Sequence, residues 1–166
     1  MKPGEECRPE RVSVRPPQLG DARTLVEAEL ECFSDPWPPQ FFVSEILADG
    51  RFNRLLVDPA GRMAAYLFCV WQYLDLHVLK VATMPQFRRH GLARRLMVLA
   101  EDHVVEMGGE SLTLEVRSSN EAAVTMYETL GYDRVGILAR YYQDGEDAVM
   151  MRKRMRNSEF GIRNSE

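Results

Sequence analysis

Residues 79–107 read LKVATMPQFRRHGLARRLMVLAEDHVVEM, and they organise the interpretation of the whole chain. The stretch opens with a short apolar run of β-forming type, which ends before Pro85 because proline cannot donate to a sheet ladder. A basic turn, 86–91, follows and contains Gly91. The positions that then recur at helical spacing are Leu92, Leu96, Leu99 and His103. The stretch therefore predicts a strand, a basic glycine turn and a helix.

A turn of this kind is suited to bind an anion. The first turn of a helix leaves backbone N–H groups without partners, and the helix dipole favours negative charge there. Gly91 allows a phosphate to approach the backbone, while Arg88 and Arg89 add charge and fork-shaped donors. The turn predicts a pyrophosphate site, with an ordinary solvated loop as the alternative. It matches neither the P-loop nor the three-glycine dinucleotide fingerprint.

Two blocks resemble a known family. Residues 88–93, RRHGLA, match the R/Q-x-x-G-x-G/A signature of the GNAT superfamily of acetyl-CoA-dependent N-acetyltransferases. Residues 114–120, LEVRSSN, followed by Tyr127 and Gly131, are similar to its RimI-type subgroup, which acetylates the N-terminal alanine of a small-subunit ribosomal protein. The resemblance covers residues 11 to 154, and the spaced pair of blocks is more specific than the glycine signature by itself.

The resemblance implies an α/β (α+β) GNAT fold, a mixed, mostly antiparallel sheet flanked by helices and splayed at the acetyl-CoA site. We expect one domain over 11–155, between a flexible N-terminus (1–10) and a disordered tail (156–166). Alternation and apolar runs predict strands over 11–15, 53–57, 63–72, 79–83, 111–116, 132–138 and 147–152. Caps and helical spacing predict helices over 21–32, 40–48, 92–107 and 120–131, the first capped by Asp21.

Acetyl transfer to an amine needs a base for the acceptor and a proton for the departing thiolate. The resemblance implies that Glu115 is the general base and that Tyr127 protonates the coenzyme A thiolate. Seven residues separate Asn120 from Tyr127, which keeps both side chains on one helix face. From the residues alone, Glu115 can also be an ordinary strand carboxylate and Tyr127 a core aromatic residue.

The resemblance also implies the cofactor site. The backbone of the strand before the turn would bind the acetyl-pantetheine arm like an added strand, through Val81, Ala82 and Thr83. The backbone of the signature would bind the pyrophosphate, through Arg88, Arg89, His90, Gly91, Leu92, Ala93 and Arg94. Asn120 has two competing roles, a contact with the coenzyme and the N-cap of its own helix. His90 and Ala93 replace a frequent glutamine and a frequent glycine of the family.

The acceptor slot is the least determined part. Tyr141 and Tyr142 resemble paired tyrosines that line this slot in N-terminal acetyltransferases, although they can equally form an aromatic pair in a hairpin. Trp37 lies where the first loop of the family walls the slot. Pro38 stands where RimI-type proteins often have a helix-capping serine, which leaves the exact acceptor open.

The predicted function is acetyl transfer from acetyl-CoA to a protein N-terminal α-amino group, with a ribosomal protein as the expected partner. The alternatives are an acetyltransferase for a small amine or a lysine side chain, and a non-catalytic acyl-CoA-binding module.

The net charge of −4 argues against nucleic-acid binding, and no apolar stretch reaches the length of a membrane span. Three cysteines without ligand spacing indicate a reducing, cytoplasmic protein without a metal. We expect a monomer or a weak dimer.

Overall fold

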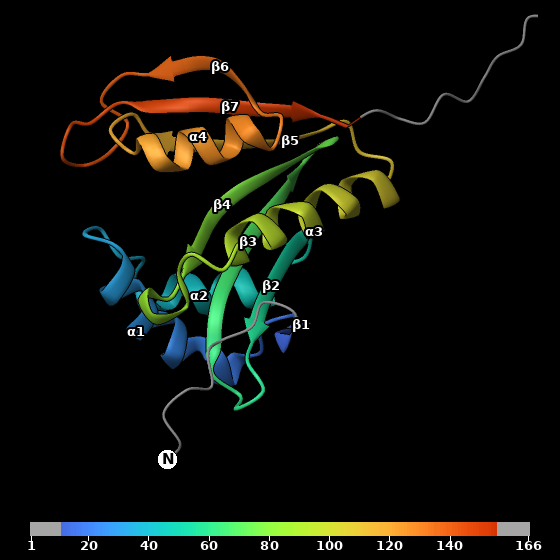
Figure 1. The fold of residues 1–166 in the computed structure, drawn as a ribbon, viewed down its shortest axis with the longest axis vertical. Helices are drawn as coiled ribbons and strands as arrows, with labels where there is room; N and C mark the ends of the chain where they lie inside the picture. The colour runs from blue at the N-terminus through green and yellow to red at the C-terminus, as the bar shows by residue number, and fades with distance from the viewer. Residues whose placement is uncertain (1–10, 156–166) are drawn as a thin grey trace, which may run out of the picture. The chain divides into compact units, whose positions relative to one another are not determined.

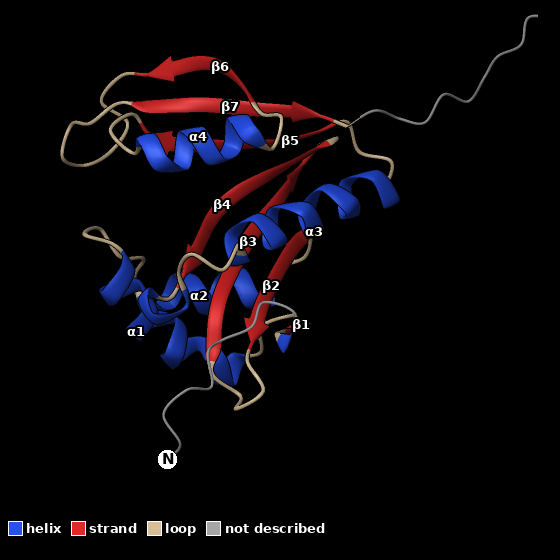
Figure 2. Cartoon of the chain, in the orientation of Figure 1, coloured by secondary structure: helices blue, strands red, loops and turns tan. Residues whose placement is uncertain are grey.

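A computed structural model describes residues 11–155 of the chain. Within them, the helices are α1 (Ala22–Cys32), α2 (Pro39–Leu47), α3 (Leu92–Glu106) and α4 (Glu121–Thr129). The strands are β1 (Ser13–Arg15), β2 (Arg51–Val57), β3 (Met63–Gln72), β4 (Asp75–Thr83), β5 (Ser111–Arg117), β6 (Asp133–Leu138) and β7 (Ala148–Arg154). Figure 2 shows the helices in blue and the strands in red. The flexible N-terminus and the disordered tail that we predicted lie outside the described residues.

The strands form one sheet in the order β1-β2-β3-β4-β5-β7-β6. The β4–β5 pair is parallel, whereas the pairs β1–β2, β2–β3, β5–β7 and β6–β7 are antiparallel. The predicted mixed, mostly antiparallel sheet flanked by helices is therefore confirmed. The described chain forms two compact units, the first from residues 11–71 and 78–98 and the second from 72–77 and 99–155. β4 and α3 each contribute residues to both units.

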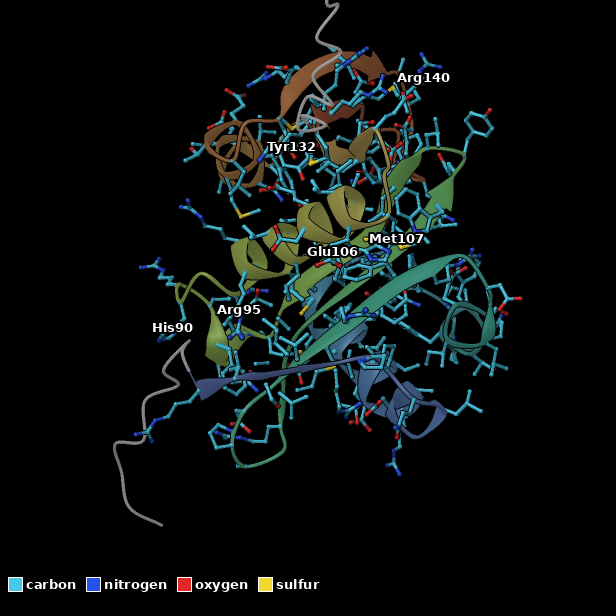
Figure 3. All side chains as sticks on the ribbon, turned by 90° about the vertical axis from the view of Figure 1, so that its right-hand side faces the viewer. His90, Arg95, Glu106, Met107, Tyr132 and Arg140 are labelled. Carbon is cyan, nitrogen blue, oxygen red and sulfur yellow. The ribbon has the colours of Figure 1, made fainter. Side chains whose placement is uncertain are left out.

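The first unit is built around β3. Its central residues, among them Tyr66 and Phe68, are fully buried. In this unit α1 and α2 cover one face of β2 and β3, and the beginning of α3 covers the opposite face (Figures 1 and 3). A strand that is covered on both faces must be apolar nearly throughout, which is the pattern of β3. The prediction of an interior strand at this position is confirmed.

The second unit is built around β5. On one side β5 pairs with the beginning of β4, through Asp75 with Ser111, Leu76 with Leu112 and His77 with Thr113. On its other side it pairs with β7 along its whole length, from Ser111 opposite Arg154 to Arg117 opposite Ala148. α4 lies against the face of β5 and β7 and buries Val124 and Tyr127 (Figure 1). β5 therefore holds this unit together from both edges.

One local prediction was wrong. Asp21 occupies the N-cap of α1, but its side chain makes no capping hydrogen bond. Its carboxylate instead accepts two hydrogen bonds from Arg15, at 2.7 and 2.8 Å, and one from the N–H of Gln18. A bidentate guanidinium is a stronger donor than a helix N–H group. The side chain therefore ties β1 to the start of α1.

The helix predicted after the turn is confirmed as α3, although its buried face is not the spaced set that indicated it. Leu92 and Leu96 are buried, but Leu99 and His103 are only half-buried. The buried positions that complete the stripe are Met97, Ala100 and Val104. An α-helix advances 3.6 residues per turn, so a neighbouring set of residues one position further on can take the buried face. Val104 is more apolar than His103, which favours this rotation.

Candidate active site

The basic turn lies in the first unit, between β4 and α3. A short 3₁₀ helix, Pro85–Phe87, ends it on one side, and Leu92 begins α3 on the other. Arg89 and Gly91 have φ values of 65° and 71°, in the left-handed region. A Cβ atom at Gly91 would meet nothing within 4 Å, so glycine is needed there for its backbone angle and not for lack of space. The first N–H groups of α3 lack helical partners, and such groups are the ones that bind an anion at a helix N-terminus.

Two side chains of the turn contact nearby backbone carbonyls. Arg88 and Arg89 are exposed, and Nε of Arg88 donates to the carbonyl of Thr83 at 3.4 Å. Nδ1 of His90 lies 3.2 Å from the carbonyl of Phe87. Figure 3 shows His90 on this turn and Arg95 on the helix that follows. The three residues expected to bind the pantetheine arm, Val81, Ala82 and Thr83, end β4, beyond its three-pair ladder with β5.

Glu115 lies in the second unit, in the middle of β5. Its neighbours Leu114 and Val116 are buried on the opposite face, while the Glu115 side chain keeps 16% of its surface exposed. Oε2 of Glu115 lies 2.8 Å from Nε2 of His77, and Nδ1 of His77 lies 2.7 Å from the Thr113 hydroxyl. A carboxylate can only accept, so Nε2 carries the proton between the two groups. The predicted base is thus part of a carboxylate–imidazole–hydroxyl chain.

His77 is a residue that the sequence analysis missed. Alternation along β4 shows which face His77 occupies, but not which residue of another strand lies beside it. That depends on the register of the β4–β5 ladder, which pairs His77 with Thr113. Thr113 and Glu115 are two residues apart on β5 and therefore share a face. A histidine in the strand before the basic turn was the available signal, and by itself it is weak.

Tyr127 and Asn120 belong to α4 and to the residue that caps it. Tyr127 is 6% exposed, and its ring packs edge-on against Tyr132 with centroids 5.8 Å apart. The Tyr132 hydroxyl lies 3.1 Å from a carboxylate oxygen of Glu101. Oδ1 of Asn120 accepts from the N–H of Ala123 at 3.1 Å, which confirms the N-cap. Tyr127 is thus part of the core of this unit.

Tyr141 and Tyr142 lie in the loop between β6 and β7. Their rings meet edge to face, with centroids 5.1 Å apart and planes at 89°. Half of the Tyr141 side chain is exposed. Partial burial, and secondarily the negative charge of Glu115, raise the pKa of Tyr141 above its ordinary value. The structure therefore brings one predicted acceptor residue within electrostatic range of the predicted base.

Arg117 anchors this loop, and the sequence analysis did not single it out. One guanidinium nitrogen donates to Asp144 at 2.8 Å and to Glu146 at 2.9 Å, and the guanidinium lies 4.0 Å above the Tyr142 ring. Glu146 also accepts from the N–H of Ser119 at 2.9 Å. Hydrogen bonds from Ser119, together with those from Arg117, lower the pKa of Glu146 to about 2. Arg117 is the last residue of the strand that carries Glu115, so the loop is held close to the base.

Trp37 lies in the first unit, in the loop between α1 and α2. Its ring centroid is 5.4 Å from those of Phe41 and Phe42 and 5.8 Å from that of Phe68. Pro38 is the N-cap of α2 and makes no side-chain capping bond; Pro39 occupies the first turn, where its fixed φ suits the helix. The helix therefore starts on proline geometry in place of a capping serine.

Among residues 11–155, no helix is long and apolar enough to cross a membrane.

The metal-ligating side chains of the described segment do not cluster. No group of three or more His, Cys, Asp or Glu residues within 11–155 could hold a metal ion. The polar side chains that meet at Glu115 are those of His77 and, through His77, Thr113.

Comparison with known proteins identifies the class. The profile of the Acetyltransferase (GNAT) family matches residues 22–132, which include the basic turn, Glu115 and Tyr127. The chain belongs to this family. Its members bind acetyl-CoA, and the chain is an N-acetyltransferase of GNAT type.

Individual relatives are N-terminal acetyltransferases. The chain is 30% identical over 150 residues to the N-terminal acetyltransferase A complex catalytic subunit ard1 of Schizosaccharomyces pombe, covering 86% of this chain and 85% of that one. It is 34% identical over 134 residues to the [ribosomal protein bS18]-alanine N-acetyltransferase of Escherichia coli K12, covering 79% and 89%. The crystal structure of the ribosomal-protein-S18-alanine N-acetyltransferase from Escherichia coli superposes with a TM-score of 0.82 at 28% identity, covering 93% and 99%.

Gly91→Ala tests the anion-binding turn. An alanine at φ 71° is strained by about 1 kcal/mol, and the substitution lowers the free energy of unfolding by that amount. The strained turn can adopt another backbone conformation in the free protein, and binding must then convert it back at a cost in free energy. We therefore expect the Kd for coenzyme A to rise about fivefold. Gly61→Ala is the matched control, because Gly61 has φ 81° and equal free space in the turn between β2 and β3. Equal coenzyme A affinity of the two variants in calorimetric titration contradicts the prediction.

Glu146→Gln tests the anchor of the β6–β7 loop. A carboxyl whose pKa falls on folding contributes stability above its unfolded pKa, and loses it as pH falls through the folded value. The window runs from the ordinary 4.5 down to about 2. We expect the variant to lose less unfolding free energy than wild type between these pH values. Glu128→Gln, which breaks an exposed pair with Arg134, is the control and keeps the wild-type slope in chemical denaturation.

Proposed function

We propose that this protein transfers the acetyl group of acetyl-CoA to the α-amino group of a protein N-terminus. The named activities of the Schizosaccharomyces pombe and Escherichia coli relatives support this acceptor class. The observation that carries the proposal is the chain from Thr113 through His77 to Glu115, since it provides a carboxylate that a neighbouring imidazole holds in one orientation.

Glu115 acts as the general base. It accepts the proton of the acceptor ammonium, which leaves the nitrogen lone pair free to attack the thioester carbonyl. His77 is a positioning residue, because its Nε2–H holds one carboxylate oxygen while the other can accept the proton. Thr113 orients the imidazole through Nδ1. The C–N bond forms as the C–S bond breaks, and no covalent intermediate on the enzyme is needed.

Tyr127 acts as the general acid and donates its hydroxyl proton to the departing thiolate. Its ring is held by Tyr132, so the hydroxyl is placed by packing. The backbone of Val81, Ala82 and Thr83 holds the pantetheine amides, and Asn120 adds a contact to the coenzyme. The pyrophosphate is bound by the basic turn and the first turn of α3, through Arg88, Arg89, His90, Gly91, Leu92, Ala93 and Arg94. Acetyl-CoA supplies the activated acetyl group.

Tyr141, Tyr142 and Trp37 bind the acceptor N-terminus. Tyr141 is suited to this because it is exposed and lies within the electrostatic range of Glu115. By analogy with the bS18-alanine acetyltransferase of Escherichia coli, the proposed acceptor is the N-terminal alanine of a small-subunit ribosomal protein. A ribosomal protein as acceptor places the proposed reaction in the cytoplasm. The free thiols of Cys32 and Cys69 fit the reducing conditions of that compartment.

A matched pair of peptides tests the function. One has a free N-terminal alanine and a blocked lysine, and the other a blocked N-terminus and a free lysine. We expect mass spectrometry to detect acetyl transfer to the first peptide only. Glu115→Gln keeps the shape of the side chain but removes the base, so we expect kcat/KM to fall about 10²- to 10⁴-fold. Transfer to lysine only, or to neither peptide, would refute the N-terminal assignment, and full activity of Glu115→Gln would refute the base.

Tyr127→Phe separates the acid from the core residue. The variant keeps the ring and its packing on Tyr132, so we expect unchanged folding but a fall in kcat of about 10²-fold or more. Tyr132→Phe is the matched control, since it also removes one hydroxyl from the same aromatic pair, the one that contacts Glu101. Steady-state kinetics with saturating peptide measure both. Equal effects of the two substitutions would assign Tyr127 to the core alone.

A further inference from the structure

Glu29 of α1 is a carboxylate buried without any exposed surface. Its Oε1 accepts from the Tyr66 hydroxyl of β3 at 2.6 Å. Its Oε2 accepts from the backbone N–H of Trp37 at 2.9 Å and lies 3.3 Å from Nζ of Lys80 in β4. Burial raises the pKa of Tyr66, so its hydroxyl stays protonated and remains a donor. All four residues belong to the first unit.

A buried carboxylate costs free energy unless its oxygens are fully satisfied. Glu29 meets this condition with one hydroxyl, one ammonium and one backbone amide. Lys80 is also nearly buried, and its Nζ lies 3.8 Å from the ring centroid of Phe33 and 5.2 Å from that of Trp37. Replacing such a pair by apolar residues is often neutral or stabilising. Stability by itself therefore does not explain why a carboxylate occupies this position.

The three residues that donate to Glu29 lie on different kinds of structural element. Tyr66 and Lys80 lie on strands, which the sheet holds in place without Glu29. Trp37 lies in the loop 33–38, which follows α1 and precedes α2. The Glu29 carboxylate thus links the loop to the sheet through the backbone of Trp37. The ring of the same residue packs against Phe41, Phe42 and Phe68. Without an acceptor at position 29, the Trp37 N–H would lose this hydrogen bond inside the protein, and the loop would move to satisfy it elsewhere.

We propose that Glu29 is a positioning residue for the acceptor, which holds the loop 33–38 and the Trp37 ring in the conformation that binds the acceptor N-terminus. The inference rests on the proposed function, in which Trp37 contacts the acceptor. Acceptor binding depends on the hydrogen bond from the Trp37 N–H to residue 29, and not on the charge of the Glu29–Lys80 pair. Cofactor binding depends on the basic turn and is independent of this bond.

Two double variants isolate the bond. Glu29→Gln with Lys80→Met and Glu29→Met with Lys80→Met both remove the ion pair and the cation–π contacts of Lys80. They differ at residue 29, where glutamine keeps a carbonyl for the Trp37 N–H and an amide for the Tyr66 oxygen, whereas methionine offers neither. Tyr66→Phe, which loses one bond of Glu29 but leaves the loop fastened, controls for stability alone. All variants are assayed below their unfolding temperatures.

We expect the methionine variant to have a KM for the alanine peptide about tenfold or more above that of the glutamine variant. The KM for acetyl-CoA is the same in both, and Tyr66→Phe keeps the wild-type peptide KM. Hydrogen exchange follows the loop directly, with the Trp37 amide protected in the glutamine variant and unprotected in the methionine variant.

Equal peptide KM values in the two double variants overturn the inference and leave the proposed function intact. The inference is also overturned if the KM for the peptide and the KM for acetyl-CoA change in parallel, or if Tyr66→Phe is as impaired as the methionine variant. Either result would show that Glu29 contributes only to general stability. Absence of acetylation by wild type overturns the proposed function and the acceptor role with it; the exchange of the Trp37 amide then still reports whether Glu29 fastens the loop.

Discussion

The second unit depends on the register of the short parallel ladder between β4 and β5. Three residue pairs define it, and the last pair sets His77 beside Thr113. A slip of one residue would turn the His77 side chain to the other face and separate it from Glu115. Polar contacts secure the register at the first pair. The Ser111 hydroxyl bonds to Asp75, and Arg152 of β7 donates to Ser111 at 2.8 Å.

Two glutamates illustrate how surroundings decide what a carboxylate can do. Glu29 is fully buried, and donors of three kinds occupy its oxygens, so it serves as an attachment point. Glu115 is held through Oε2 by His77, on a strand that ends at the loop-anchoring Arg117. It keeps some exposed surface, through which a proton can reach it. The same residue type is structural in one unit and is the candidate base in the other.

The basic turn uses backbone geometry more than side chains. Its two left-handed residues, Arg89 and Gly91, direct the chain into α3, whose first N–H groups are the proposed anion site. A site made by the backbone tolerates changes of side chain. The substitutions at His90 and Ala93, relative to the usual family pattern, are therefore compatible with cofactor binding.

The sequence alone determined the order of strands and helices, the interior position of β3, the basic turn and the positions of Glu115, Tyr127 and Asn120. The elements follow from local periodicity, caps and turn residues, which act over a few positions, whereas Glu115 and Tyr127 were singled out by the resemblance to the GNAT family. The capping role of Asp21 was predicted incorrectly, because its contact with Arg15 overrides the local preference. His77, Arg117 and the buried attachment of Trp37 to Glu29 appeared only in the tertiary structure. His77 and Arg117 contact residues far from them in the chain, and Trp37 contacts Glu29, eight positions earlier. Strand register and loop packing decide these contacts, and the periodicity of a single sequence does not show either of them.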